Sequence, residues 1–210
     1  MHVVIAGNIG SGKTTLTKML AKHYGWDVRL ESVTYNPYLE DYYKDMSRWA
    51  LNLEVYFLKE RFRDLLEIKK SPKPVIQDRS IYEGVYIFSS NNHDMGNMSD
   101  RDYETYMGLF NSMMMVVEKP DLMVYLRASV PHLVDNIHKR GRGYEQNMRL
   151  DYLKNLNDRY DRFFQRQYKG PKITVDVENL DFVRNKEDFA AITSSINKRI
   201  DMRLDRKSVV

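Results

Sequence analysis

Residues 7–14 read Gly-Asn-Ile-Gly-Ser-Gly-Lys-Thr, which is the spacing of a phosphate-binding loop. An apolar run precedes it and helical spacing follows it, so the loop is expected between a strand and a helix. Its glycines allow backbone N–H groups to turn toward a phosphate, and the helix N-terminus adds positive charge. Lys13 would reach the outer phosphates, and the Thr14 hydroxyl would hold Mg²⁺. The loop predicts a bound nucleoside triphosphate, contacted by Gly7, Asn8, Ile9, Gly10, Ser11, Gly12, Lys13, Thr14 and Thr15.

The rest of the chain predicts a parallel β-sheet that carries this loop at one edge. Besides residues 3–6, short apolar runs predict strands at residues 26–30, 74–77, 121–126 and 172–177. Helical stretches separate them, which favours a five-stranded parallel sheet covered by helices on both faces. In such sheets ligands gather at the carboxyl ends of the strands. Glu31 and the pair Asp78–Arg79 follow two of these strands, and we expect them to converge on the loop.

These polar residues suit phosphoryl transfer, although each also has a purely structural interpretation. Asp78 would hold Mg²⁺ beside the loop, or would cap the following helix. Arg79 would hold phosphate oxygens, or would form an ion pair with Glu31. Glu31 would take the proton of an attacking hydroxyl, or would be a surface carboxylate at a strand end. Together they favour a kinase site.

Two arginines around a glycine, Arg140 and Arg142, form a basic turn after a predicted helix. They would clamp a transferring phosphoryl group and exclude water, or would be a solvated helix end. Phe88 and the Tyr82–Tyr86 pair are expected in the core on their own pattern. Helices are predicted over residues 42–70, from Ser99 to about 118, and over 151–168 and 186–200, with a polar surface loop at 91–97.

The composition is that of one globular domain in the cytoplasm. We expect a single kinase domain over residues 1–204 and a frayed tail at 205–210. The chain has no cysteine, and no secretory signal or membrane span is visible. Its net charge of +4 comes without a basic block, so nucleic acid is not expected as a partner.

From residue 3 to about residue 182, the chain resembles the deoxynucleoside kinases, which phosphorylate deoxynucleosides at the 5′-hydroxyl. Residues 31–33, 49–56, 78–82 and 140–142 carry the resemblance most specifically, and residues 36–43 resemble bacterial members, many of which act on purine deoxynucleosides. The resemblance implies a three-layer P-loop NTPase fold with an arginine lid. It also implies ATP as donor, Mg²⁺, and a homodimer. The methionine-rich stretch at 113–115 is a possible interface, or core.

The resemblance also implies roles for individual residues. Glu31 would be the general base, oriented by Arg79, and Lys13, Arg140 and Arg142 would stabilise the transferring phosphoryl group. The substrate would contact Tyr43 and Glu145 at its 3′-hydroxyl, Phe88 by stacking, and Glu54 and Arg61 at the base edge. The adenine of ATP would lie near Asp181 and Phe182.

Three positions depart from the family pattern. Glu54 stands where a glutamine is usual, and an ionised carboxylate only accepts hydrogen bonds, which favours a purine. Gly84 stands where many members have an aspartate that pairs with the arginine at position 61. Asn136 replaces an arginine of several members, so stabilisation of the transition state must depend on the remaining basic residues.

Two other functions are weaker alternatives. A nucleoside monophosphate kinase, such as a thymidylate kinase-like protein, shares the loop and the lid, but Glu31 would repel the phosphate of its acceptor. A nucleotide-binding switch module ranks third, because no Asn-Lys-x-Asp motif and no Asp-x-x-Gly motif after a strand is present.

Overall fold

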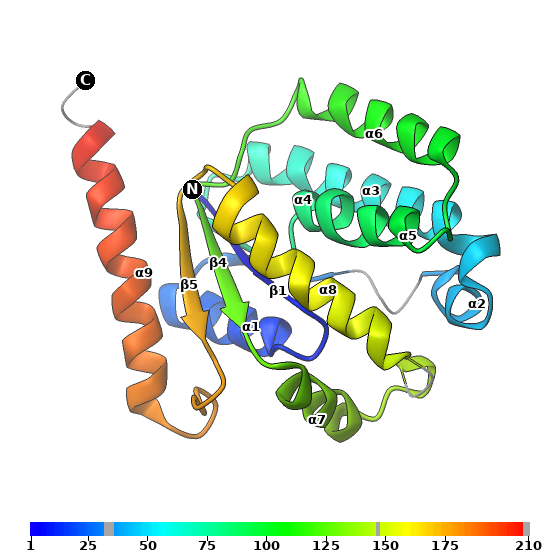
Figure 1. Ribbon diagram of the computed structural model, residues 1–210. Helices are drawn as coiled ribbons and strands as arrows, with labels where there is room; N and C mark the ends of the chain where they lie inside the picture. Colours follow the sequence, from blue (N-terminus) through cyan, green and yellow to red (C-terminus); the bar gives the residue numbers. More distant parts are fainter. Residues whose placement is uncertain (32–35, 146–147, 208–210) are drawn as a thin grey trace.

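The computed structural model describes residues 1–31, 36–145 and 148–207. Ser32 and Val33, on which part of the family resemblance depends, lie outside the described residues, as does the end of the expected tail at 208–210. A sheet lies at the centre of the molecule with helices packed around it, and the C-terminal helix lies along one side (Figure 1).

The sheet has five parallel strands in the order β2-β3-β1-β4-β5, which confirms the prediction. At its centre lies β1 (His2–Gly7), paired with β3 (Val75–Asp78) and β4 (Leu122–Arg127). The edge strands are β2 (Asp27–Arg29) and β5 (Lys172–Asp176). Every residue of β1 is buried, as expected of a strand that is covered on both faces.

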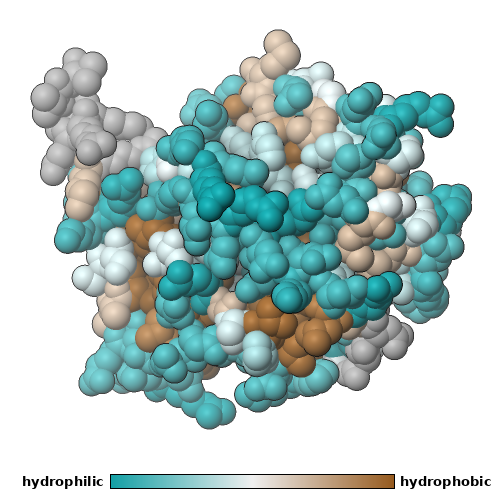
Figure 2. Space-filling model, in the orientation of Figure 1, coloured by the Kyte–Doolittle hydropathy of each residue, from teal (hydrophilic) through white to brown (hydrophobic). Residues whose placement is uncertain are grey.

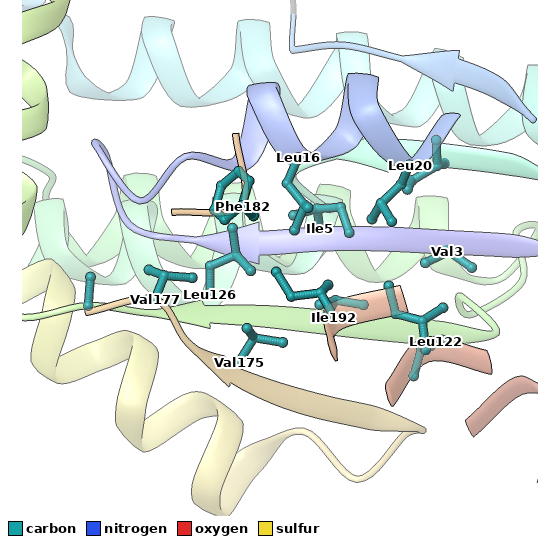
Figure 3. Close-up of a cluster of buried hydrophobic side chains, with 14 of the residues drawn as sticks. Val3, Ile5, Leu16, Leu20, Leu122, Leu126, Val175, Val177, Phe182 and Ile192 are labelled. Atoms are coloured by element: carbon teal, nitrogen blue, oxygen red, sulfur yellow. The ribbon is translucent and has the colours of Figure 1, made fainter. Parts of the chain in front are cut away.

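Helices cover both faces because side chains alternate along each strand. Val3 and Ile5 face a core cluster that includes Leu16 and Leu20 of α1 and Ile192 of α9 (Figure 3). Val4 and Ala6 face a second cluster, built from α3, α4, α6 and α8. The main helices are α1 (Lys13–Tyr24), α2 (Leu39–Lys44), α3 (Met46–Lys70), α4 (Ile81–Glu83), α6 (Asp100–Met114), α7 (Val130–Arg140), α8 (Leu150–Arg162) and α9 (Lys186–Lys207).

Local capping explains where several helices begin. The stretch predicted as one helix at 42–70 is two, because Asp45 leaves the helical conformation and accepts a hydrogen bond of 3.0 Å from the Arg48 N–H. Ser99 caps α6 as predicted, by accepting from the Asp102 N–H. At the other end of the chain, α9 continues to Lys207, so the tail does not begin at Asp205.

The prediction of a surface loop at 91–97 is wrong. A π-helical segment, η1 (Gly84–Ser89), leads directly into α5 (Ser90–Asp94). Asn91 and Asn92 are buried, with Asn92 fully covered. Their amides bond to other side chains inside the protein, and a polar residue that is satisfied in this way is indistinguishable from a solvated one in sequence.

Hydrophilic side chains cover most of the face shown in Figure 2, and hydrophobic ones gather mainly in its lower half. Among the described residues, none of the helices combines the length and the apolar character that a membrane crossing requires. The exposed apolar side chains include Leu109 of α6 and Met115 and Val116 just after it.

Leu16→Ala should destabilise the protein by about 2–5 kcal/mol, because Leu16 is fully buried between α1 and the sheet and its loss leaves a cavity. Urea unfolding of both proteins would measure the difference. Leu109→Ala is the matched control, since Leu109 is 39% exposed and should cost far less. Equal losses for the two variants would contradict this account of the core.

Candidate active site

The phosphate loop follows the central strand and requires glycine at three positions. Gly7, Gly10 and Gly12 have φ angles of 151°, 87° and 87°, a region that L side chains rarely adopt. A Cβ on Gly10 would also lie 2.6 Å from the Leu133 carbonyl oxygen of α7. Asn136, also on α7, donates a hydrogen bond of 2.9 Å to the Gly10 carbonyl, so it ties this helix to the loop. The backbone of the loop is therefore fixed by close packing.

Lys13 lies folded into this loop. Its ammonium donates to the Asn8 carbonyl at 2.8 Å, and the side chain is buried. Burial, helped by the charge of Arg79, lowers the pKa of Lys13 to about 8, although Asp78 and Glu31 act in the opposite direction. A phosphate is the ligand that this desolvated cation would favour most.

Thr14 and Asp78 form the part of the site suited to a magnesium ion. The Thr14 hydroxyl donates to one carboxylate oxygen of Asp78 at 2.5 Å, and the other oxygen, Oδ1, is buried and has no partner among the described residues. Burial raises the pKa of Asp78, and a cation would reverse this. In the described part of the chain, His, Cys, Asp and Glu side chains form no metal-binding group of three or more. Two protein ligands fit Mg²⁺, which keeps several waters and binds phosphates.

The alternative interpretation of Asp78, as a helix cap, is wrong. Ser80 caps α4 instead, because its hydroxyl accepts from the Glu83 N–H at 3.3 Å. The Glu83 carboxylate returns the contact by accepting from the Ser80 N–H at 2.6 Å. Asp78 is therefore left free of a capping role.

Glu31 is held by two guanidinium groups at the carboxyl edge of the sheet. The same oxygen, Oε1, lies 2.9 Å from Arg79 Nε and 2.5 Å from Arg61 Nη2. Burial by itself would raise the pKa of Glu31, but Arg79, Arg61 and Lys13 together outweigh it and lower the pKa to about 2. The predicted ion pair of Arg79 with Glu31 is therefore present. It also leaves Arg79 in the cavity beside the loop, where it could contact a phosphate.

Arg79 is the most constrained residue of the site. It is 4% exposed, and its φ of 69° makes it the one residue other than glycine with a positive φ in the described ranges. Its guanidinium donates to the Tyr160 hydroxyl and lies 3.6 Å from the Glu83 carboxylate. Tyr160 in turn donates to Glu83 at 2.9 Å. Tyr160 and Glu83 belong to no recognised motif, and the sequence therefore did not identify them as part of the site.

Phe88 lies at the cavity wall and not in the core, which corrects the expectation from its own pattern. The Arg79 guanidinium carbon lies 4.6 Å from the centre of its ring. The π-helical turn of η1 places the ring here, one face toward the site. Tyr82 is buried against Phe110, as expected of a core residue.

A cavity adjoins the loop, and polar groups from several elements converge on it. It brings together all the residues predicted for the acceptor. Its polar lining includes Lys13, Thr14, Glu31, Tyr43, Glu54, Arg61, Arg79, Arg140, Arg142 and Glu145. Its apolar lining includes Ile9, Leu39, Leu53, Phe57 and Phe88, of which Phe88 was predicted for the acceptor and Ile9 for the triphosphate.

The two arginines of the basic turn contact Glu145. Arg140 ends α7 and donates from Nε at 3.0 Å and from Nη2 at 2.6 Å, a forked ion pair. Arg142 lies 3.4 Å from the same carboxylate. Gly141 between them has a φ of 68° and allows the chain to turn here. Arg140 and Arg142, predicted to hold the phosphoryl group, and Glu145, predicted to bind the sugar, therefore form one cluster.

A second cavity lies on the other side of the loop and suits the donor nucleotide. Gly10 to Thr15 line it, together with Asn136, Arg140, Arg142 and the segment that contains Asp181 and Phe182. Phe182 packs on Gly12, where an added Cβ would lie 3.0 Å from the ring. Lys13 and Thr14 line both cavities, so donor and acceptor would meet there.

A phosphate loop at the carboxyl edge of a parallel sheet, with an acceptor cavity next to it, defines a P-loop phosphotransferase. The sequence model described as deoxynucleoside kinase matches residues 3–201. The chain belongs to the deoxynucleoside kinase family, and it is a phosphotransferase that acts on a deoxynucleoside hydroxyl.

Individual relatives agree with this assignment. A deoxyadenosine/deoxycytidine kinase of Bacillus subtilis is 36% identical and covers 92% of this chain and 90% of its own. A deoxyguanosine kinase of the same organism is 34% identical, with 94% and 97% covered. The structure of a deoxyadenosine kinase from M. mycoides with bound dATP superposes with a TM-score of 0.83 at 32% identity, covering 94% of this chain and all of that one.

Glu31→Gln should lower stability at neutral pH, on the order of 3 kcal/mol, because it removes the carboxylate that two buried guanidinium groups share. The folded-state pKa of about 2 lies below the ordinary value of 4.5. The contribution of Glu31 is therefore complete above the unfolded pKa and is lost as pH falls toward the folded pKa. The difference between wild type and variant should shrink below about pH 4.5.

Urea unfolding from about pH 7 down to about pH 3 would measure this difference. Glu67→Gln is the control, since Glu67 forms an exposed ion pair with Arg29 and should change stability by less than about 1 kcal/mol. A difference for Glu31→Gln that stays constant over the whole range would show that its ion pairs do not set its pKa.

Proposed function

We propose that this enzyme transfers the γ-phosphate of ATP to the 5′-hydroxyl of a deoxynucleoside. One observation carries the proposal: Glu31 lines the acceptor cavity within reach of the charge of Lys13, whose ammonium lies in the phosphate loop. A carboxylate there can accept the proton of a hydroxyl that is in line with a phosphate in the loop. The dATP held by the M. mycoides enzyme supports a nucleoside triphosphate in such a fold.

In this mechanism Glu31 acts chiefly by orientation. Its two arginines hold the carboxylate ionised and fixed, so it positions the hydroxyl and takes the proton as negative charge moves off the attacking oxygen. The low pKa makes it a weak base toward a free alcohol. The proton therefore moves late, when bond formation to phosphorus has already acidified the hydroxyl.

The phosphoryl group would be stabilised by Lys13, Arg79, Arg140 and Arg142. Arg140 and Arg142 would act as an arginine lid, leaving Glu145 for the phosphates when the donor binds. Asn136 cannot take part, because its amide is bonded to the loop backbone. Mg²⁺ would bind Thr14 and Asp78 Oδ1 and neutralise charge on the phosphates.

Tyr43 and Glu145 would bind the sugar 3′-hydroxyl, and Phe88 would stack on the base, with Glu54 and Arg61 at the base edge. Arg61 pairs with Glu31 and would have to turn from it to reach the base. Gly84 lies beside the Arg61 guanidinium but has no carboxylate with which it could pair instead. We propose purine deoxynucleosides as the main substrates, supported by the deoxyguanosine kinase of Bacillus subtilis and the deoxyadenosine kinase from M. mycoides. ATP would place its adenine near Asp181 and Phe182.

A nucleoside monophosphate kinase is the weaker proposal. Its acceptor brings a phosphate of its own, which needs available positive charge in the acceptor cavity. Among the described residues that line the cavity, Arg61 and Arg79 pair with Glu31, and Arg140 and Arg142 pair with Glu145. A neutral hydroxyl fits this balanced arrangement better.

We also propose a homodimer, supported by the exposed apolar side chains of Leu109, Met115 and Val116 in and after α6. Sedimentation would give the mass. The proposed donor and acceptor are solutes of the cytoplasm, which supports a cytoplasmic enzyme that binds neither nucleic acid nor membrane.

The function is tested by supplying purified enzyme with ATP and Mg²⁺ and a panel of deoxynucleosides and their monophosphates. Phosphorylation of the deoxynucleosides alone is expected, and the product should carry its phosphate on the 5′-oxygen. Phosphorylation of the monophosphates alone would establish the rival function.

Glu31→Ala should lower kcat by about 100-fold or more while the affinity for ATP changes little, because Glu31 lines the acceptor cavity and not the donor cavity. Steady-state kinetics and fluorescent ATP-analogue binding would separate the two effects. Lys13→Ala is the contrasting variant, since it should weaken both. Unchanged turnover in Glu31→Ala would remove Glu31 from the reaction.

A further inference from the structure

A chain of buried hydrogen bonds ends on Glu54 at the far end of the acceptor cavity. The Tyr42 hydroxyl donates to Asn92 Oδ1 at 2.7 Å, and Asn97 Nδ2 donates to the same oxygen at 3.4 Å. Tyr152 lies 3.2 Å from the Tyr42 hydroxyl and completes the chain. Two donors on Oδ1 fix the orientation of the Asn92 amide, so its Nδ2 must donate to Glu54 Oε1, at 3.1 Å.

The other oxygen of Glu54, Oε2, is buried and has no partner in the described protein. Glu54 is 2% exposed and lines the cavity that we assign to the acceptor. Since Oε1 already accepts a hydrogen bond, Oε2 is the atom left to carry a proton and to donate it to a ligand.

The surroundings of Glu54 do not supply the cation that an ionised carboxylate would need. On the same helix, Arg61 places its Nη2 on Glu31, and Arg79 from the end of β3 does the same with its Nε. A buried carboxylate with one neutral donor is costly, and protonation removes the cost.

The other titratable groups around Glu54 come from several elements. Glu31 follows β2, and the hydroxyls of Tyr42, Tyr106 and Tyr152 belong to α2, α6 and α8. Burial, assisted by Glu31, raises the pKa of Glu54 to about 8 against the opposing charges of Arg61 and Arg79. At neutral pH the acid form therefore predominates.

The two forms of a carboxyl group read different bases. A neutral acid has one donor and one acceptor, which match a ring nitrogen and the adjacent amine of adenine or cytosine, and equally O6 and N1–H of guanine. A carboxylate only accepts. It retains two bonds with N1–H and N2–H of guanine, but only one with adenine or cytosine, where it also faces a ring lone pair.

We propose that Glu54 reads adenine and cytosine as a neutral carboxylic acid whose Oε2–H donates to a ring nitrogen, and that loss of this proton shifts selectivity toward deoxyguanosine. This inference rests on the proposed function. It replaces the acceptor-only role expected for Glu54 with a selectivity that depends on the protonation of one side chain.

The test is kcat/KM for deoxyadenosine, deoxycytidine and deoxyguanosine from about pH 6.5 to about pH 9, in wild type and Glu54→Gln. In wild type, the ratio of deoxyadenosine to deoxyguanosine should fall about tenfold as pH rises, because adenine loses one hydrogen bond. The deoxycytidine ratio should fall in parallel. In Glu54→Gln both ratios should follow only the titration of the bases themselves, since the amide keeps its donor at every pH.

Glu60→Gln is the matched control, because Glu60 is a buried glutamate of α3 that pairs with Lys59 and Arg63 outside the cavity. It should retain the wild-type pH dependence. Deoxynucleoside phosphorylation with the same pH dependence in wild type and Glu54→Gln would overturn this inference and leave the proposed function intact. Absence of turnover with every deoxynucleoside would overturn both.

Discussion

The buried guanidinium of Arg79 is the group on which the rest of the site depends. Its backbone N–H donates to Ile5 of the central strand, and its side chain contacts Glu31, Glu83 and Tyr160, which belong to three other parts of the chain. A charge that is 4% exposed must be neutralised, here by Glu31 and Glu83. The left-handed backbone that directs it there is a strain that the packed surroundings maintain. Arg79 thereby fixes the positions of β1, Glu31, Glu83 and Tyr160 relative to one another.

Pairing with that guanidinium determines which carboxyl groups of the cavity are charged. Glu31 and Glu54 both lie out of bulk water, yet their pKa values move in opposite directions, to about 2 and about 8. Glu31 pairs with Arg61 and Arg79, whereas Glu54 accepts a hydrogen bond from the neutral amide of Asn92. The part of the cavity that we assign to the phosphate is therefore a charged network, while the part that we propose for the base holds hydroxyl and amide groups around Glu54. This separation suits a substrate whose reacting end develops charge and whose base does not.

Most of the fold could be predicted from sequence, because each strand is a short apolar run and each long helix has its own period and stop signals. The five strands and their parallel arrangement are as expected. The errors have local causes. Asp45 divides one long apolar period into two helices by capping the second. The polar run at 90–94 is a helix with two buried asparagines, which are satisfied by side chains far away in sequence. Periodicity does not encode such partners.

The site shows the same division. Residues next to the loop or at strand ends could be predicted, because topology brings those ends together whatever the intervening sequence. Tyr160, Glu83 and Asn92 could not, since each acts through a hydrogen bond with a predicted residue of another element. Their effect is nevertheless chemical: without Asn92 to fix one oxygen of Glu54, nothing would determine which oxygen faces the base. The sequence motifs identify the reacting groups, whereas buried hydrogen-bond and ion-pair partners outside the motifs determine the protonation of those groups.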